Sequence, residues 1–191
     1  MAKIGLFKPK YSKITLGTDA QGNDTETYGP AKPFAKAISA TTSVNTSKVK
    51  LYADDGVAEM ANEFVSGQIT FNADDLEDSV EADIAGATVD ETDGSFRNKD
   101  TDTPQYIRFG FMIRRMKNNV MQYRAVIFPK VLFDVPADDY ETKGETIVFK
   151  STTITGEIMR NKDHDWRIKS KWTSSEEEAA AFLDANIAPG V

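Results

Sequence analysis

Residues 50–59 read Lys-Leu-Tyr-Ala-Asp-Asp-Gly-Val-Ala-Glu and separate two segments that have the pattern of β-strands. Before the acidic pair, Val49 and Leu51 alternate with lysines, which is typical of a half-buried strand. An Asp-Gly pair between two such segments is the strongest short-range signal for a β-hairpin. The sequence therefore predicts a hairpin that turns at Asp54, Asp55 and Gly56.

Further β-like segments recur on both sides of this hairpin. The Asn118-Asn119 pair predicts a second tight turn, because asparagine tolerates the positive φ that such turns require. Gly67 and Pro129 are predicted to mark bulges in their strands. The predicted strands cover residues 1–16, 35–42, 47–53, 57–72, 105–116, 120–133, 146–160 and 166–172.

Two helices are predicted. The first covers residues 75–85, with Asp74 as its N-cap and Gly86 as its left-handed C-cap. Its apolar residues recur every four positions and so share one face, which must pack on a sheet. The second occupies the C-terminal segment 174–191, where Ser174 and Glu177 form a capping box and the helix runs to about Asn186. Its weak apolar stripe consists of Ala180, Leu183 and Ile187.

These elements predict a single, mainly β (α+β) domain over residues 1–191. The expected architecture is a two-sheet β-sandwich or partly open barrel, flanked by one short helix and followed by a C-terminal helix. Clusters of Gly, Pro, Asn and Asp predict long loops at residues 17–33 and 88–104. Both loops are longer than compact domains usually carry, so we expect them to contribute to assembly contacts.

Composition excludes several classes of function. The chain has no cysteine and a formal net charge of −7, which argues against thiolate chemistry and against nucleic-acid binding. The cluster Arg114-Arg115-Met116-Lys117 is interpreted as a solvated strand end. No apolar run is long enough for a membrane span, and the N-terminus lacks the apolar core of a signal peptide, so the expected location is the cytoplasm.

No set of residues predicts catalysis, and we expect the protein not to be an enzyme. His164 is the single histidine, and its neighbours Asp163 and Asp165 point in alternating directions, which indicates a turn rather than a metal site. No G-x-S-x-G motif presents a serine nucleophile. The adjacent carboxylate pairs, such as Asp138-Asp139, are explained by turns. We therefore predict no catalytic residue, no metal and no cofactor.

Three segments of the chain, spread over residues 48–172, form a recognisable set. The first consists of Val49-Lys50-Leu51-Tyr52-Ala53-Asp54-Asp55 with Val57, Ala58 and Glu59; the second of Ile69, Phe71, Asp74, Asp75 and Leu76 on to Gly86. The third consists of Tyr140-Glu141-Thr142-Lys143-Gly144-Glu145, Ile147, Phe149, Thr153, Ile154, Gly156, Asp163 and Trp166. Together these segments resemble the major tail protein (tail tube protein) family of bacteriophages with long non-contractile tails, and their order and spacing make the resemblance fairly specific.

The resemblance implies a structural virion protein that assembles into hexameric rings, which stack into a tube. The tube conducts the genome during ejection and is filled by the tape measure protein during assembly. Tail terminator and tail tip proteins are the further partners, and no membrane is involved. The implied location is the virion tail, and the host cytoplasm during assembly.

An acidic tube suits a conduit for DNA. Six copies at −7 each would carry −42 formal charges, and such a wall repels a polymer that is itself densely negative. We hypothesise that Asp54, Asp55, Glu59 and Glu63 lie on or near a lumen-facing hairpin. The alternative is that Asp54 and Asp55 only shape the turn.

Two other functions stay open on the sequence. One is the tube of a contractile injection system, such as a bacteriocin or a type VI secretion machine. The other is a monomeric β-sandwich that binds carbohydrate, which would need Trp166 and Trp172 as an exposed patch on one face.

Overall fold

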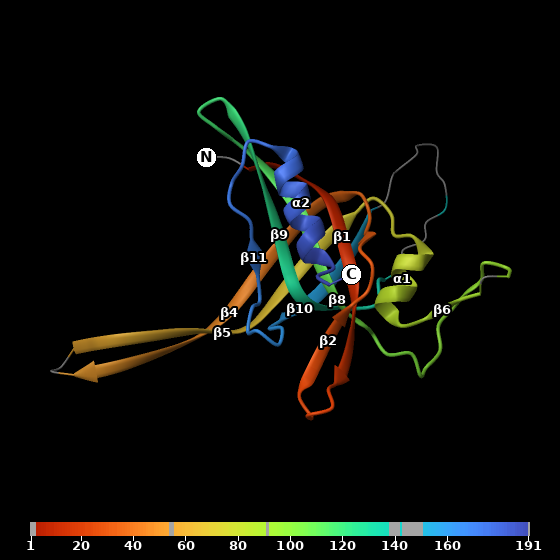
Figure 1. Cartoon of the computed structure of the whole chain (residues 1–191), viewed down its shortest axis with the longest axis horizontal. Coiled ribbons are helices and arrows are strands. Elements are labelled where there is room, and N and C mark those ends of the chain that lie inside the picture. The colour runs from red at the N-terminus through yellow and green to blue at the C-terminus, as the bar shows by residue number, and fades with distance from the viewer. Residues whose placement is uncertain (1–2, 54–55, 91, 138–141, 143–150, 191) are drawn as a thin grey trace.

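The computed structural model describes residues 3–53, 56–90, 92–137, 142 and 151–190, and Figure 1 shows a mainly β chain. The helices are α1 (Asp78–Ala85) and α2 (Glu176–Ile187). The long strands are β1 (Lys3–Thr18), β4 (Ala37–Ala53), β5 (Gly56–Ala73), β8 (Tyr106–Lys117), β9 (Val120–Phe133) and β10 (Thr152–Met159). The short strands are β2 (Asp24–Tyr28), β3 (Lys32–Pro33), β6 (Thr88–Val89), β7 (Phe96–Arg97) and β11 (Ile168–Lys169).

One large antiparallel sheet contains all but two of these strands. Its order is β2-β1-β8-β9-β10-β5-β4, with β3 paired to β1 and β11 to β9, while β6 and β7 form a small second sheet. The large sheet curls so that β1 and β4, from its two halves, line a common groove. The predicted fold class, a mainly β sandwich or partly open barrel with a C-terminal helix, is confirmed.

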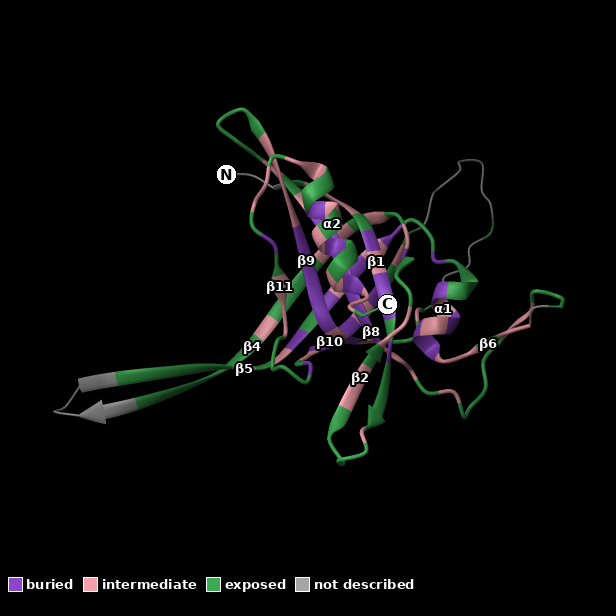
Figure 2. Ribbon diagram, viewed as in Figure 1, coloured by how far each residue is buried: buried purple, intermediate pink, exposed green. Residues whose placement is uncertain are grey.

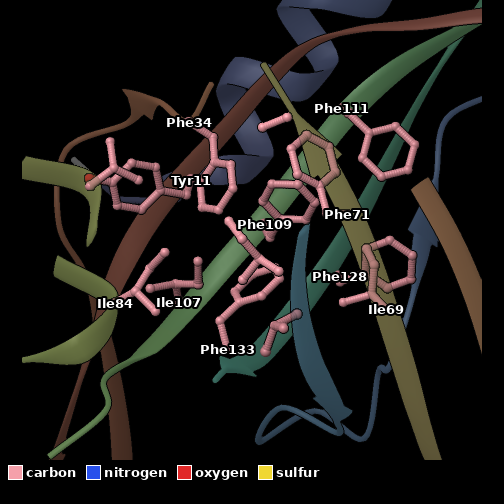
Figure 3. Packing of buried hydrophobic residues seen from close by; sticks show 14 of the residues in the cluster. Tyr11, Phe34, Ile69, Phe71, Ile84, Ile107, Phe109, Phe111, Phe128 and Phe133 are labelled. Atoms are coloured by element: carbon pink, nitrogen blue, oxygen red, sulfur yellow. The ribbon is translucent and has the colours of Figure 1, made fainter. Parts of the chain in front are cut away.

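The concave face of the curled sheet holds the main hydrophobic core. Along β8, Ile107, Phe109 and Phe111 alternate with residues of the opposite face, as a strand with one face in a core requires. Figure 3 shows Phe34 packed among aromatic rings from several strands. The Phe34 ring lies 4.9 Å from Phe109 and 5.4 Å from Phe71, centre to centre. This aromatic cluster joins side chains of β1, β5, β8 and β9 inside the curled sheet.

Helix α2 covers the convex face of β8 and β9 and forms a second apolar cluster (Figure 1). Its buried residues Ala179, Leu183 and Ile187 are spaced so that they share one face. The helix begins one residue later than predicted, because the Ser175 hydroxyl, not Ser174, accepts a hydrogen bond from the backbone N–H of Glu178. Neither helix in the described residues is long and apolar enough to cross a membrane.

Helix α1 packs its predicted apolar face, with Val80 and Ile84, into the main core, and Asp83 adds polar contacts to the body. The Asp83 carboxylate accepts a hydrogen bond from the Tyr11 hydroxyl at 2.8 Å and forms ion pairs with Lys13 at 3.0 Å and Lys32 at 2.7 Å. The helix is three residues shorter than predicted at its start, with Glu77 as N-cap, because Asp74 instead accepts the backbone N–H of Lys36. Gly86 ends it in the left-handed conformation, as predicted.

The predicted loop at residues 17–33 is largely wrong. Strand β1 continues to Thr18, and β2 returns beside it with Asp24 opposite Thr18. The Asp19 carboxylate closes the turn by accepting the backbone N–H groups of Gln21 and Asn23. The turn-forming residues therefore mark a tight hairpin rather than a long loop. By contrast, the segment 88–104 is mostly loop, with only the short strands β6 and β7 in it.

Both predicted hairpins are present. Asn118 and Asn119 have φ values of 52° and 58° between β8 and β9. Strands β4 and β5 pair up to Ala53 and Gly56, on either side of the predicted acidic turn. The two segments predicted separately at residues 35–42 and 47–53 form the single strand β4.

Of the two predicted bulges, one is confirmed. The register between β8 and β9 shifts at Pro129 and Lys130. Gly67 does not form a bulge, since the extra residue in β5 is Val65. Gly67 instead permits a close approach, because a Cβ there would lie 3.3 Å from the Ile158 Cβ atom.

Candidate assembly interface

The distal part of the β4–β5 hairpin projects from the body as a two-stranded arm (Figure 1). We define the arm as residues 46–53 of β4 and 56–64 of β5, which pair from Thr46 and Phe64 out to Ala53 and Gly56. Strand β10 pairs with β5 only from Gly67 onward, so among the described strands the arm pairs with itself alone. An isolated two-stranded hairpin is marginally stable in water, so the sheet of the body contributes little to the stability of the arm beyond its root.

The arm carries exposed apolar side chains that contribute nothing to the core. Val49 is 63% exposed and Met60 is 56% exposed, and Figure 2 shows the described part of the arm as almost entirely exposed. Singly exposed apolar residues are common, but these two lie on the part of the arm beyond Phe64, which pairs with no other described strand. The arm therefore has the composition of a contact surface.

The two faces of the arm differ in charge. Residues directly opposite in an antiparallel pair share a face, and Val49 lies opposite Ala61. Alternation along β5 places Glu59 and Glu63 on that same face, which we call the acidic face. On the other face, Lys50 lies opposite Met60 and Lys48 opposite Asn62. We call this the basic face.

The root of the arm is fixed to the body by aromatic stacking. The Phe64 ring lies 4.7 Å from Trp166 with an interplanar angle of 9°. Arg160 lies over the Phe64 ring at 5.6 Å and also donates a hydrogen bond to the Phe64 carbonyl oxygen. The arm consequently leaves the body in a defined direction rather than as a free loop.

An open groove lies beside the root of the arm, between the edges β1 and β4. Its volume is about 400 Å³, and its floor is apolar. Strand β4 is the last strand in the sheet order, so its outer edge is unpaired within the described sheet. Unpaired edges are sites where another chain can add to a sheet. The groove is lined by Ile4, Gly5, Leu6, Ile38, Ser39, Ala40, Thr42, Phe111, Ile113, Arg124, Val126, Phe128, Arg167, Lys169 and Trp172.

The charged residues that line this groove are all cationic. Neither Arg124 nor Arg167 forms a salt bridge with a carboxylate of the described chain. Arg124 lies 5.0 Å from the centre of the Trp172 ring and donates from Nε to the Ser170 carbonyl oxygen at 2.6 Å. Arg167 lies 4.2 Å from the centre of the Trp166 ring.

Burial makes these two guanidinium charges costly. It lowers the pKa of Arg124, and the nearby charge of Arg115 lowers that pKa further. Burial also lowers the pKa of Arg167. A carboxylate placed beside either guanidinium would favour its charged form. The groove thus combines an apolar floor with cations that an acidic partner would stabilise.

The structure places only half of the predicted acidic site. Glu59 and Glu63 are exposed and share the acidic face of the arm. Asp54 and Asp55 lie outside the described residues. The position of this set relative to a lumen stays a prediction.

The arginines of the groove are the residues that the sequence did not reveal. The cluster at Arg114 and Arg115 is partly exposed at the end of β8, close to its interpretation as a strand end. Arg115, however, also packs 3.9 Å from the centre of the Trp172 ring. The sequence does show cations close to Trp172, among them Arg167 and Lys169. Only the fold, however, brings Arg124 and Arg167 to one groove.

The other chemically suggestive residues do not form a site. His164 is exposed and has a φ of 64°, in a turn that the Asn161 carboxamide closes by accepting the N–H groups of Asp163 and Asp165. Within the described ranges, no group of three or more His, Cys, Asp or Glu side chains could hold a metal ion. Trp166 lies against Phe64 and Trp172 against Arg115, so neither indole is a free platform.

No protein-family model matches the chain, and no curated protein sequence matches it.

Proposed function

We propose that the protein is a structural subunit that polymerises into a tube, as the major tail tube protein of a long-tailed bacteriophage. The observation that carries the proposal is the arm, an ordered hairpin with exposed apolar side chains and no partner strand among the described ones. A monomer gains nothing from such an element, whereas a polymer uses it as a contact. We take the polymer to be a tail tube because the hairpin sequence resembles that of tail tube proteins.

The open sheet edge supports the same proposal. The outer edge of β4 is long and lies at the end of the large sheet. Exposed edges of this length are normally blocked, since they promote pairing between molecules. In a ring of subunits the edge becomes a contact instead, and neighbouring sheets join around a central channel. The genome would pass through this channel without specific binding.

Negative-stain electron microscopy of the concentrated protein tests the proposal. We expect hollow tubes or six-fold rings. The matched control is a chain in which Asn-Gly replaces residues 47–63, which removes the arm but leaves the body intact. Native protein that stays monomeric at every concentration would contradict the proposal and favour a monomeric binding module.

The lumen hypothesis for Asp54, Asp55, Glu59 and Glu63 has a separate test. If these carboxylates line the channel, replacing them with lysine leaves ring assembly intact and impairs DNA release. Normal infection by virions that carry the replacements would contradict a lumen role.

The tube of a contractile injection system is a second candidate, since the arm and open edge suit either machine. A gene for a sheath protein beside the gene for this chain would favour it. The carbohydrate-binding alternative is less well supported, because the Trp166 ring is stacked on Phe64 and the Arg167 guanidinium also lies 4.2 Å from its centre.

A further inference from the structure

We propose that the groove between β1 and β4 is the receptor for the acidic face of the arm of a second copy of this chain. The inference rests on the proposed function in one respect: it takes the partner of the groove to be a second copy of this chain. It assigns Glu59 and Glu63 to a protein–protein contact, with Arg124 and Arg167 as their counterparts.

Charge complementarity is the first argument. The acidic face presents two carboxylates, and the groove presents two guanidinium groups that have no carboxylate partner in the described chain. The basic face of the same arm carries Lys48 and Lys50 and would be repelled. The arm therefore docks in one orientation, with its acidic face toward the groove.

The apolar surfaces are complementary as well. On the acidic face, exposed Val49 lies between the two carboxylate positions, because its cross-strand partner Ala61 lies between Glu59 and Glu63. In the groove, Phe111, Val126 and Phe128 form a floor beside the arginines. An apolar centre flanked by carboxylates thus meets an apolar floor with arginines beside it.

The arm does not occupy the groove of its own chain. Ile38, Ser39, Ala40 and Thr42 of β4 line the groove, and the same strand then runs on into the arm, away from the body (Figure 1). Each copy therefore offers a groove and an arm at different places. Two copies can exchange arms reciprocally as a two-fold dimer, whereas a heterologous arrangement of the same contact closes into a ring or continues as a helical filament.

Charge reversal on the two faces tests the orientation. We expect Glu59→Lys with Glu63→Lys to weaken self-association about 10- to 100-fold, measured by sedimentation velocity. The matched control is Lys48→Glu with Lys50→Glu on the basic face, which should not weaken it. Adding Arg167→Glu to the Glu59→Lys, Glu63→Lys chain restores opposite charges and should recover most of the association. Equal loss from both faces, or no recovery, would overturn the inference.

Cross-linking provides a second measurement. Because the chain has no native cysteine, every disulfide formed must involve an introduced cysteine. Val49→Cys on the acidic face and Ile38→Cys at the groove both replace exposed side chains. Mixing the two variants under mild oxidation should yield a disulfide-linked dimer. Met60→Cys lies on the basic face at a similar distance along the arm and should yield at least about tenfold less. Equal yields from both faces would exclude the docking orientation.

The two proposals fail in different ways. Tubes whose formation is indifferent to Glu59, Glu63 and Arg167 would leave the tube function standing and remove the groove as the receptor. A face-specific cross-link in a protein that forms dimers but no rings or tubes would support the groove and contradict the tube function. Normal ring assembly by the Glu59→Lys, Glu63→Lys chain would favour the lumen position over the groove.

Discussion

Gly110 is a position where a single missing side chain determines how a helix packs. A Cβ atom there would lie 2.8 Å from the Leu183 Cδ1 atom and 3.1 Å from the Ile127 Cγ1 atom. We expect Gly110→Ala to lower the free energy of unfolding by about 1 to 3 kcal/mol, because α2 must shift away from the sheet. Urea denaturation measures the change. Gly29→Ala is the matched control, since its Cβ would meet only ordinary contacts at 3.7 Å or more.

Asp83 makes part of the stability dependent on pH. Burial alone would raise the pKa of its carboxyl, but hydrogen bonds from Lys32, Tyr11 and Lys13 outweigh burial and lower the pKa below its ordinary value of 3.8. Its contribution to stability is therefore complete above pH 3.8 and is lost as the pH falls through the lower pKa of the folded state. We expect Asp83→Asn to lower the free energy of unfolding by about 1 kcal/mol at pH 7.

Denaturant unfolding at several pH values checks the sign of this effect. The difference between native protein and Asp83→Asn should shrink as the pH falls from 5 toward 2. Asp184→Asn is the control, because its exposed ion pair with Lys10 contributes little. A difference that stays constant down to pH 2 would show that the carboxylate charge is not the cause.

Among the elements, the arm is expected to contribute little to the stability of the body. Replacement of residues 47–63 by Asn-Gly should change the free energy of unfolding by no more than about 0.5 kcal/mol, since none of the side chains that the structure describes in this segment belongs to the core. The same change should abolish self-association. Thermal unfolding and sedimentation measure the two properties on one preparation. A large loss of stability would mean that the arm packs on its own body.

The sequence predicted the elements whose signals are local. The turn at Asn118 and Asn119, the bulge at Pro129 and the C-cap at Gly86 follow from the backbone preferences of those residues. The start of α1 was missed because Asp74 bonds to Lys36, a contact between residues distant in sequence. The turn-forming residues of the segment 17–33 indicated that the chain reverses direction there. They did not indicate how short the turn is, because that depends on the pairing of β2 with β1.

The candidate interface was only half predictable for the same reason. Glu59 ends the quoted hairpin stretch and Glu63 lies one β-strand segment further on, so the sequence could assign them to one site. Arg124 and Arg167 lie on β9 and just before β11, and they reach one groove only because the sheet curls. Periodicity within a strand carries no information on that curvature, which accompanies contacts between residues distant in sequence, such as those of Phe34 with Phe71, Phe109 and Phe133.

For the whole molecule, assembly through the groove should respond to salt. Contacts between carboxylates and guanidinium groups weaken as the Debye length falls from about 10 Å at 0.1 M to about 3 Å at 1 M. We expect self-association to weaken over this range, as measured by light scattering at fixed protein concentration. The control variant on the basic face of the arm, Lys48→Glu with Lys50→Glu, should lose self-association with salt to the same extent as the native protein. Association that strengthens with sodium chloride would indicate a purely apolar contact.

The stacking of Phe64 on Trp166 has a spectroscopic consequence. The chain contains two tryptophans, and one lies at the root of the arm while the other lines the groove. Both indoles should therefore change surroundings when an arm enters a groove: Trp166 in the copy that provides the arm, and Trp172 in the copy that provides the groove. The intrinsic fluorescence of the unlabelled protein should report polymerisation in real time, and Trp166→Phe and Trp172→Phe would separate the signals of the two ends.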